Sequence, residues 1–528
     1  MATSLVVFPR FWAARLACVT VALTAPLSAN AQVEVIRSAP DVSGQPTRYR
    51  LTVDAVRPSD REPMANDVRI PSEQRRRGNR ASAYIKLISL AAEHPTDYRK
   101  GLRDHRDAWL ESPLGDAECR AASRWLASHE SLRAGLRMVI ENDHCDFGAN
   151  VFGLPASKLL QMPLPELHGL RELGKFARLE SRVALREGRF ADALAALRTA
   201  RQMADDTAGI PLTLPPLLSL AQHLTVAQTL QDWIATPKSA NLYWVLAALP
   251  RPAIDLHTAA DIERLSFELQ LRDPADNVAP VPGTSKPPVA TEDEAARWLR
   301  LIRPFWELES GPSESQTPGG EKGGASDTDG VKRQRQSMMD ARAMASLYPA
   351  AKRRLIAAGW TAEQVEPLPI GQVIALSTTQ VNREVQQRLL KWPALESPDS
   401  WPNLFADSRR LLDSANVALG GNFEGTLGVS RQLFDIILAT RYVEANYARQ
   451  IAALRIVEAL RWHAAEHGGQ LPASLAEIRV APIPPDPLTG KPFEYTVRDG
   501  VGALELGPHS APGIAQQVST WEIVIRRP

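Results

Sequence analysis

The chain has 528 residues, of which 44% are hydrophobic and 23% are charged, and its 61 basic and 60 acidic side chains nearly cancel. These proportions are typical of a globular protein and exclude a disordered chain. The balanced charge predicts no nucleic-acid partner, and three cysteines are too few for a disulfide-dense scaffold. The length fits roughly two to four domains or one extended helical array.

Residues 1–31 have the features of a secretory signal peptide. A basic start without acidic residues precedes the apolar run 16–27, and Ala29-Asn30-Ala31 then fits the small-x-small cleavage pattern. We therefore predict cleavage between Ala31 and Gln32 and an exported protein that is periplasmic, envelope-associated or extracellular. The alternative is an uncleaved segment, which would then be the contact of this protein with a membrane.

Export would place Cys119 and Cys145 in an oxidising compartment. A disulfide between them would close a loop of roughly 26 residues, worth about 3 kcal/mol in the loop-entropy model. We predict this disulfide. The alternatives are two buried thiols or one reactive thiol.

Residues 32–71 form an N-terminal extended segment, because apolar and polar residues alternate over 33–36 and 48–56. This alternation predicts one or two short strands. From residue 72 to 272 the apolar spacing becomes helical and predicts a helical domain.

The clearest helical hairpin covers residues 184–204, where Gly188 separates two helical runs. This segment resembles the second half of a tetratricopeptide repeat, and the alternative is a generic helical hairpin. Residues 207–231 carry no charge but contain three prolines. We predict a helix buried inside the protein, too short to span a membrane, with His223 as a core histidine.

Residues 273–335 form a Pro-rich and low-complexity linker that contains one helix, 292–308. A second helical region follows over 336–450, in which Thr361 and Gln364 fit a capping box. Five tryptophans of these segments are predicted in the core, with a groove lining as the alternative: Trp298, Trp306, Trp360, Trp392 and Trp401.

Residues 451–528 form a C-terminal α+β module. A helix ends at His467-Gly468-Gly469, where glycine suits the left-handed cap. A short helix is predicted over 474–477, and proline and glycine residues then turn the chain into strands. A helix packed on a small antiparallel sheet is expected.

The order of these C-terminal signals resembles the globular part of type II secretion pseudopilins over about 70 residues. The residues that carry the resemblance are Gly469, Leu471, Pro472, Leu475, Asp486, Pro487, Gly490, Pro492 and Tyr495. The resemblance implies an accessory role in a secretion or pilus-like machine. The transmembrane helix of the pseudopilins, with its processing site, is missing from the N-terminal sequence, so a filament-forming role does not carry over.

The chain as a whole also resembles a group of large, uncharacterised exported bacterial proteins. The shared runs are Asn241-Leu242-Tyr243-Trp244, Leu249-Pro250-Arg251-Pro252, Ile456 to Leu460, Leu471 to Leu475 and Asp486 to Phe493. This resemblance implies export and no particular activity.

The sequence contains no phosphate loop, no Gly-x-Ser-x-Gly nucleophile elbow and no His-Glu-x-x-His motif, so we predict no catalytic residue and no cofactor. His463, Glu466 and His467 lie one helical turn apart, close enough to share a divalent ion. The alternative, which we favour, is a polar face beside a helix end without a metal.

We predict a mainly α fold of helical hairpins, packed as a TPR-like solenoid or bundle and closed by a small C-terminal α+β module. The leading function is an exported, non-enzymatic interaction or scaffold protein of the cell envelope that binds another protein. One alternative is a hydrolase of an envelope polymer with a cleft between helices. The other is an accessory factor of a secretion or pilus-like machine.

Overall fold

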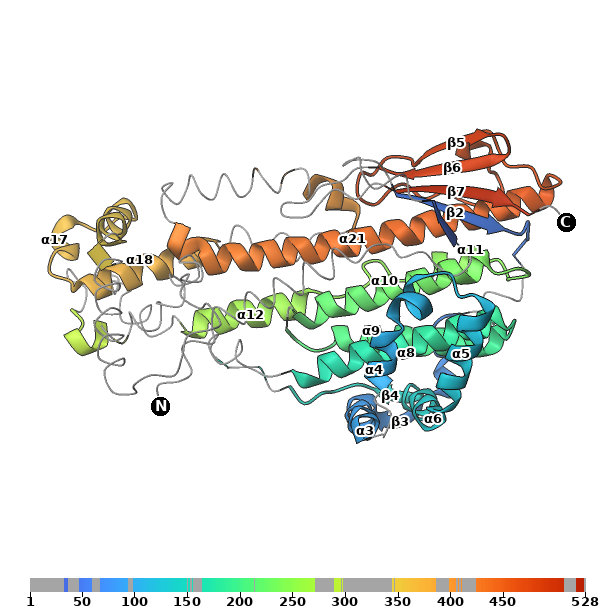
Figure 1. Ribbon diagram of the computed structural model, residues 1–528. Helices are drawn as coiled ribbons and strands as arrows, with labels where there is room; N and C mark the ends of the chain where they lie inside the picture. Colours follow the sequence, from blue (N-terminus) through green and yellow to red (C-terminus); the bar gives the residue numbers. More distant parts are fainter. Residues whose placement is uncertain are drawn as a thin grey trace, which may run out of the picture.

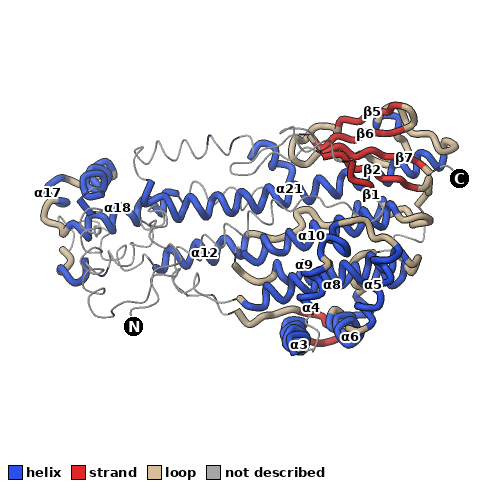
Figure 2. Tube along the Cα trace, viewed as in Figure 1, coloured by secondary structure: helices blue, strands red, loops and turns tan. Residues whose placement is uncertain are grey.

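The computed structural model shows a mainly helical protein with a small sheet at one end, as predicted (Figures 1 and 2). It describes residues 33–36, 47–58, 67–93, 98–149, 164–212, 214–270, 289–295, 347–385, 398–404, 424–507 and 519–526, together with isolated positions between these ranges.

The N-terminal half of the described chain is a series of helices. They are η1 (Ser72–Gln74), α3 (Arg80–Glu93), α4 (Tyr98–Asp104), the π-helical turn η2 (Asp107–Glu111), α5 (Asp116–Ala127), α6 (Glu130–Val139), α8 (Pro165–Arg186), α9 (Phe190–Ala208), α10 (Leu214–Ala235), α11 (Tyr243–Ala247) and α12 (His257–Gln270). Further along the chain lie α17 (Ala362–Val365), α18 (Ile370–Val385), η4 (Pro398–Ser400), the long α21 (Glu424–Glu466) and η5 (Leu475–Glu477).

The predicted hairpin at Gly188 is confirmed as α8 and α9. Gly188 has a φ of +72°, and Arg189 N donates to Ala184 O at 2.8 Å across it. This is the Schellman geometry, in which glycine takes the left-handed position without a side-chain penalty. The likeness to a tetratricopeptide repeat stays a prediction.

The helical body continues from this hairpin to α10 and α21. Helix α9 packs on both α8 and α10, and α10 packs on α21 (Figure 1). The uncharged segment forms most of α10, whose side chains are largely buried, so the predicted buried helix is confirmed. No helix among the described residues is long and apolar enough to span a membrane.

The sheet joins strands from both ends of the chain in the order β1-β2-β7-β6-β5. Its strands are β1 (Val33–Ile36), β2 (Thr47–Val53), β5 (Glu494–Arg498), β6 (Val501–Leu506) and β7 (Ser519–Ile525). Strand β2 runs parallel to β7, and the other neighbours are antiparallel. Leu51 pairs with Ile523 in this parallel ladder, and both are fully buried because alternate side chains face the helices.

This sheet corrects two of the predicted domain boundaries. Residues 32–71 are not a separate segment, because their strands complete the sheet of the C-terminal module. The boundary between residues 450 and 451 falls inside α21, whose helix is continuous.

A second, two-stranded parallel sheet, β3 (Arg76–Asn79) with β4 (Asn142–His144), was also not predicted.

Two local predictions are confirmed by hydrogen bonds. Thr361 and Gln364 form a reciprocal capping box at the start of α17. Gly468 and Gly469 have φ of +61° and +85°, and Gly469 N donates to Ala464 O at 2.8 Å, which ends α21 as expected. The predicted signal segment 1–31 and most of the predicted linker 273–335, including most of its helix 292–308, lie outside the described residues.

Candidate binding pocket and aromatic surface

A pocket lies between α21 and the segment that follows α11. Its cavity volume is about 30 Å³, room for one or two water molecules, and it opens to solvent on one side. The lining residues are Leu246, Ala247, Leu249, Pro250, Arg251, Pro252, Ala253, Trp401, Tyr447, Ala448, Ile451, Ala452 and Arg455.

The motif Asn241-Leu242-Tyr243-Trp244 holds this segment against α21. The Asn241 Nδ2 group donates to Val56 O at 3.1 Å and to Glu458 O at 3.0 Å, which links the residues after β2 to α21. Asn241 Oδ1 also accepts the N–H of Tyr243 at 3.0 Å and starts α11. Asn241 thus links the segment that leads into the pocket wall to two distant parts of the chain.

The inner wall of the pocket is apolar and aromatic. Leu246, Ile451 and Tyr447 are buried, and Trp401 has no exposed surface. Among the described residues, the Trp401 Nε1 group has no hydrogen-bond acceptor, although a buried indole N–H usually finds one. The pocket thus combines an apolar interior with an unused donor on a lining residue.

The charged groups that line the pocket are both guanidinium groups. Arg251 is exposed at the rim, and Arg455 is half-buried. Arg455 Nη2 donates to the Tyr243 hydroxyl at 3.3 Å, and its guanidinium carbon lies 5.3 Å from the Tyr243 ring centroid. Arg455 Nε has no acceptor, and the described residues place no carboxylate within ion-pair distance of Arg251 or Arg455.

Several buried arginines elsewhere in the described chain behave differently, because each pairs with a carboxylate. These pairs are Arg80 with Asp206, Arg182 with Asp232, Arg441 with Glu444, Arg449 with Asp486 and Arg461 with Glu458. Pairing is the usual way in which a buried charge is tolerated. In the pocket, by contrast, no described carboxylate pairs with Arg251 or Arg455.

An aromatic surface adjoins the pocket through Arg455. It consists of Trp244 and Trp462, which pack on the buried Tyr243. The ring centroids of Tyr243 and Trp244 are 5.0 Å apart, and those of Trp244 and Trp462 are 6.4 Å apart, both edge-to-face. Trp244 is 44% exposed, an unusual state for the largest side chain. Tyr243 is buried, and its hydroxyl donates to Pro482 O.

A polar pair, the buried His223 and the half-buried Asp205, contacts the pocket residue Tyr447 through His223. His223 on α10, confirmed as a core histidine, contacts Tyr447 at a centroid distance of 5.3 Å. Its Nε2 atom lies 3.2 Å from Asp205 Oδ1 on α9. Burial acts to raise the pKa of Asp205, but His223 and Arg201 outweigh it and lower the pKa below the ordinary value. Burial also raises the pKa of Tyr447 to about 12, so its hydroxyl stays protonated.

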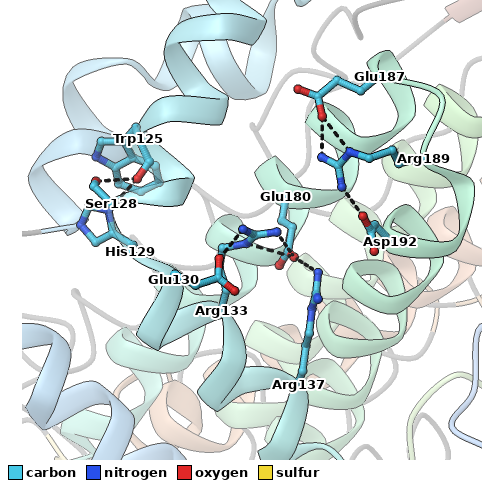
Figure 3. Close-up of polar contacts among 10 residues, drawn as sticks. All are labelled: Trp125, Ser128, His129, Glu130, Arg133, Arg137, Glu180, Glu187, Arg189 and Asp192. Atoms are coloured by element: carbon cyan, nitrogen blue, oxygen red, sulfur yellow. Dashed lines mark hydrogen bonds and ion pairs between the residues drawn. The ribbon is translucent and has the colours of Figure 1, made fainter.

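A second polar cluster, drawn in Figure 3, has a structural explanation. The buried Glu180 of α8 lies between the guanidinium groups of Arg133 and Arg137 of α6. Ser128 Oγ and His129 Nδ1 both contact the carbonyl oxygen of Trp125, at 2.7 and 2.8 Å. The serine and histidine thus cap the end of α5, because they both contact the Trp125 carbonyl group in the last helical turn, where carbonyl groups lack a helical partner.

The lining of the pocket bears on the predicted alternative of a hydrolase. That alternative requires acidic or imidazole side chains that converge in a cleft. Among the described residues, the side chains that line this pocket include no Asp, Glu or His. The hydrolase alternative stays a prediction.

The residues proposed as metal candidates have other partners. The rings of His463 and His467 stack with centroids 3.8 Å apart, and His467 Nδ1 lies 2.8 Å from His463 O. Glu466 instead accepts from Trp462 Nε1 at 3.1 Å. Among the described residues, no group of three His, Cys, Asp or Glu is placed to hold a metal ion.

The predicted disulfide is wrong in this structure, in which Cys119 and Cys145 are both free thiols. Cys119 lies on α5 near Glu187 and Arg186, whereas Cys145 follows β4 near Asp206 and Arg80. The spacing of the two residues carries no information about this three-dimensional separation. Burial raises the pKa of Cys145 to about 12 and also raises that of Cys119, so neither thiol is activated.

The site was not found from the sequence. Of the five tryptophans predicted in the core or along a groove, Trp401 lines the pocket, Trp360 is half-buried, and Trp298, Trp306 and Trp392 lie outside the described residues. Trp244 enters the sequence prediction only as part of a shared run. Its contact with Trp462 joins positions far apart in the chain, for which the sequence holds no local signal.

No protein-family model, curated protein or solved structure matches the chain.

Proposed function

We propose that this is an exported interaction protein of the cell envelope that binds another polypeptide at the pocket and the aromatic surface. The observation that carries the proposal is the exposed Trp244 beside an apolar pocket with arginine side chains. Tryptophan, tyrosine and arginine dominate the energetic hot spots of protein interfaces, where an aromatic residue anchors next to a pocket.

The proposal of export comes from the N-terminal sequence. Cleavage between Ala31 and Gln32 would leave strand β1, which begins at Val33, intact in the mature chain. Mass spectrometry of the protein recovered from the envelope fraction tests this point. A mature N-terminus at Gln32 is expected. Recovery of the protein from the cytoplasm with residues 1–31 still attached would contradict export.

The binding proposal is tested by recovery of a partner from an envelope extract of the native host. Tagged full-length chain is compared with Trp244→Ala and with Met138→Ala, which truncates a residue of α6 that is 67% exposed. The wild-type and Met138→Ala chains are expected to retain the same specific protein, and Trp244→Ala to lose it at least tenfold. If the wild-type chain recovers no specific protein, or if Trp244→Ala recovers it equally well, the proposal fails.

A second candidate is an accessory role in a secretion or pilus-like machine. The long helix α21, followed by the antiparallel meander β5-β6-β7, supports it. Removing residues 451–528 is an unsuitable test, because it cuts α21 within the core. Deletion of the whole gene is therefore preferred, and unchanged export of the other secreted proteins would remove this candidate.

A further inference from the structure

Arg455 differs from the other arginines of α21 whose side chains are described. The buried Arg441, Arg449 and Arg461 each pair with a carboxylate, whereas Arg455 is half-buried and has no described carboxylate within ion-pair distance. Its guanidinium instead meets the ring and the hydroxyl of Tyr243, which are neutral groups. A partly desolvated cation without a counter-charge costs free energy, and an anionic group of a partner would reduce this cost.

A second arginine lies beside the first. Arg251 lines the same cavity as Arg455 and is exposed at its rim. Because the cavity volume is only about 30 Å³, a partner group binds over its mouth rather than inside it. Like charges at one opening repel each other, and an anion placed between the two guanidinium groups stabilises both.

Two carboxylates near this surface leave its net charge positive. Glu466 accepts an indole N–H at 3.1 Å and lies 3.8 Å from Arg57. Asp255, which follows Arg251 in the chain, accepts a backbone N–H at 2.8 Å. Together with Arg455, the arginines outnumber these two carboxylates, so the surface favours a partner of negative charge.

The aromatic surface continues from the two arginines through Tyr243. Trp244 and Trp462 both pack edge-to-face on the ring that also contacts Arg455, and Trp244 is 44% exposed. Tryptophan and arginine are enriched together at the centres of protein interfaces, where apolar side chains cover the indole. The surface therefore suits a segment that carries both negative charge and an apolar side chain.

We propose that the aromatic surface and the two arginines bind an acidic segment of the partner polypeptide, with its carboxylates over Arg251 and Arg455 and an apolar side chain on Trp244. This inference rests on the proposed function, because it assumes that the partner is a polypeptide. It adds the charge and the composition of the segment that is recognised.

The test is selection from a random library of short peptides displayed on phage, with the purified full chain as bait. Peptides that the wild-type chain retains and Trp244→Ala does not are sequenced. These peptides are expected to be enriched about threefold or more in Asp and Glu over the unselected library, with an apolar residue beside them. Enrichment of neutral or basic peptides, or the absence of any peptide that depends on Trp244, would overturn the inference.

The contribution of charge is then measured with the peptide that is most enriched. It is synthesised as selected and with Asn and Gln in place of Asp and Glu. In fluorescence anisotropy at low salt, the acidic peptide is expected to bind about tenfold more tightly than its neutral version, and high salt should narrow this difference by screening the exposed charges. Equal affinity of the two peptides at low salt would contradict the inference.

Matched variants identify the arginines. Arg251→Glu reverses an exposed charge and is expected to weaken the acidic peptide about tenfold, whereas Arg120→Glu makes the same change on the exposed face of α5 and should have less than about a twofold effect. Arg455→Gln is expected to weaken the peptide about threefold or more, and Arg251→Glu keeps the test open if this variant does not fold. Wild-type affinity in both pocket variants would contradict the inference.

Two further measurements address other occupants of the surface. Phosphatidylglycerol vesicles test an anionic membrane, and their binding in place of every peptide would overturn the polypeptide assignment. Analytical ultracentrifugation of the full chain tests a second copy of this protein. A dimer that Trp244→Ala dissociates would likewise overturn the assignment.

The two proposals fail separately. If Trp244→Ala loses the envelope partner but the selected peptides carry no excess of acidic residues, the interaction function stands and the acidic assignment is wrong. If no partner is recovered from the envelope extract, the proposed function fails even where acidic peptides are selected.

Discussion

At the scale of single residues, paired charges hold the helical body to the sheet. Arg461 of α21 is fully buried and donates to both Glu458 carboxylate oxygens at 3.0 Å. It also donates to Asp54 O at 2.9 Å and to Ser239 O at 2.8 Å. One guanidinium thus joins α21, the residues after β2 and those after α10. Sequence reasoning could not identify this role, because its partners are distant in the chain.

We expect Arg461→Met to lower the free energy of unfolding by about 3–5 kcal/mol, because it leaves Glu458 as a buried charge without its partner. Urea unfolding followed by circular dichroism measures this change. Arg120→Met on the exposed face of α5 is the control and should change stability by less than about 0.5 kcal/mol. Similar losses for both variants would contradict the assigned role.

The pH dependence of stability provides a second residue-scale prediction. Burial lowers the pKa of His463 below its ordinary value of 6.5, and the neighbouring His467 lowers it further. The unfolded chain therefore binds this proton more readily, so stability present above about pH 6.5 is lost as the pH falls. The pKa values of Asp54 and Asp205 are both lowered, so these carboxyl groups titrate below the pH range in which His463 titrates.

The measurement is the drop in Tm between about pH 7.5 and 5.5, a window that covers the ordinary histidine pKa. His463→Gln is expected to reduce this drop, because the side chain at this position no longer titrates. His168→Gln, at an exposed position of α8, should leave it unchanged. An unaltered drop in His463→Gln would show that His463 does not contribute.

At the scale of elements, the predictions from local chemistry succeeded and those that needed distant partners failed. Gly188 ended a helix, Thr361 started one, and the uncharged segment gave the buried α10, since each signal acts within a few residues. Strand β2 was also expected. Its parallel partner β7 was not, because pairing across nearly the whole chain leaves no pattern in either segment. The pocket was missed for the same reason.

The turn between α8 and α9 is tested by Gly188→Ala. The left-handed backbone, with a φ of +72°, costs an alanine about 1–2 kcal/mol, although nothing within 4 Å would touch the added Cβ. Chemical unfolding should show this loss. Gly507→Ala is the matched control, because its Cβ also meets open space and its φ is not in the left-handed range. Equal stability of the two variants would exclude backbone strain as the reason for the glycine.

At the scale of the whole molecule, the two ends of the described chain meet in one sheet, beside the end of α21 (Figure 1). Arg50 of β2 pairs with Glu522 of β7 at 2.8 Å, in direct cross-strand register. Arg526 pairs with Asp54 at 2.7 Å, and Asp54 also accepts from the N–H of Lys238 after α10. The sheet therefore supports the segment that leads into α11 and the pocket.

Deleting residues 32–58 removes both N-terminal strands and should expose the β7 amides to hydrogen exchange. The expected loss of protection follows from the parallel β2–β7 ladder. Deleting residues 32–37 removes only the edge strand β1 and should leave β7 protected. Full protection of β7 in the longer deletion would contradict the joined sheet.

The central claim, that the protein binds a polypeptide at the pocket, is tested most directly by site-specific photocross-linking in the native host. A benzophenone amino acid replaces Arg251 at the pocket rim or Arg120 on α5, both exposed positions. We predict a protein adduct of one defined mass at position 251 and none of that mass at position 120. Absence of the adduct at position 251, or the same adduct at both positions, would contradict the claim.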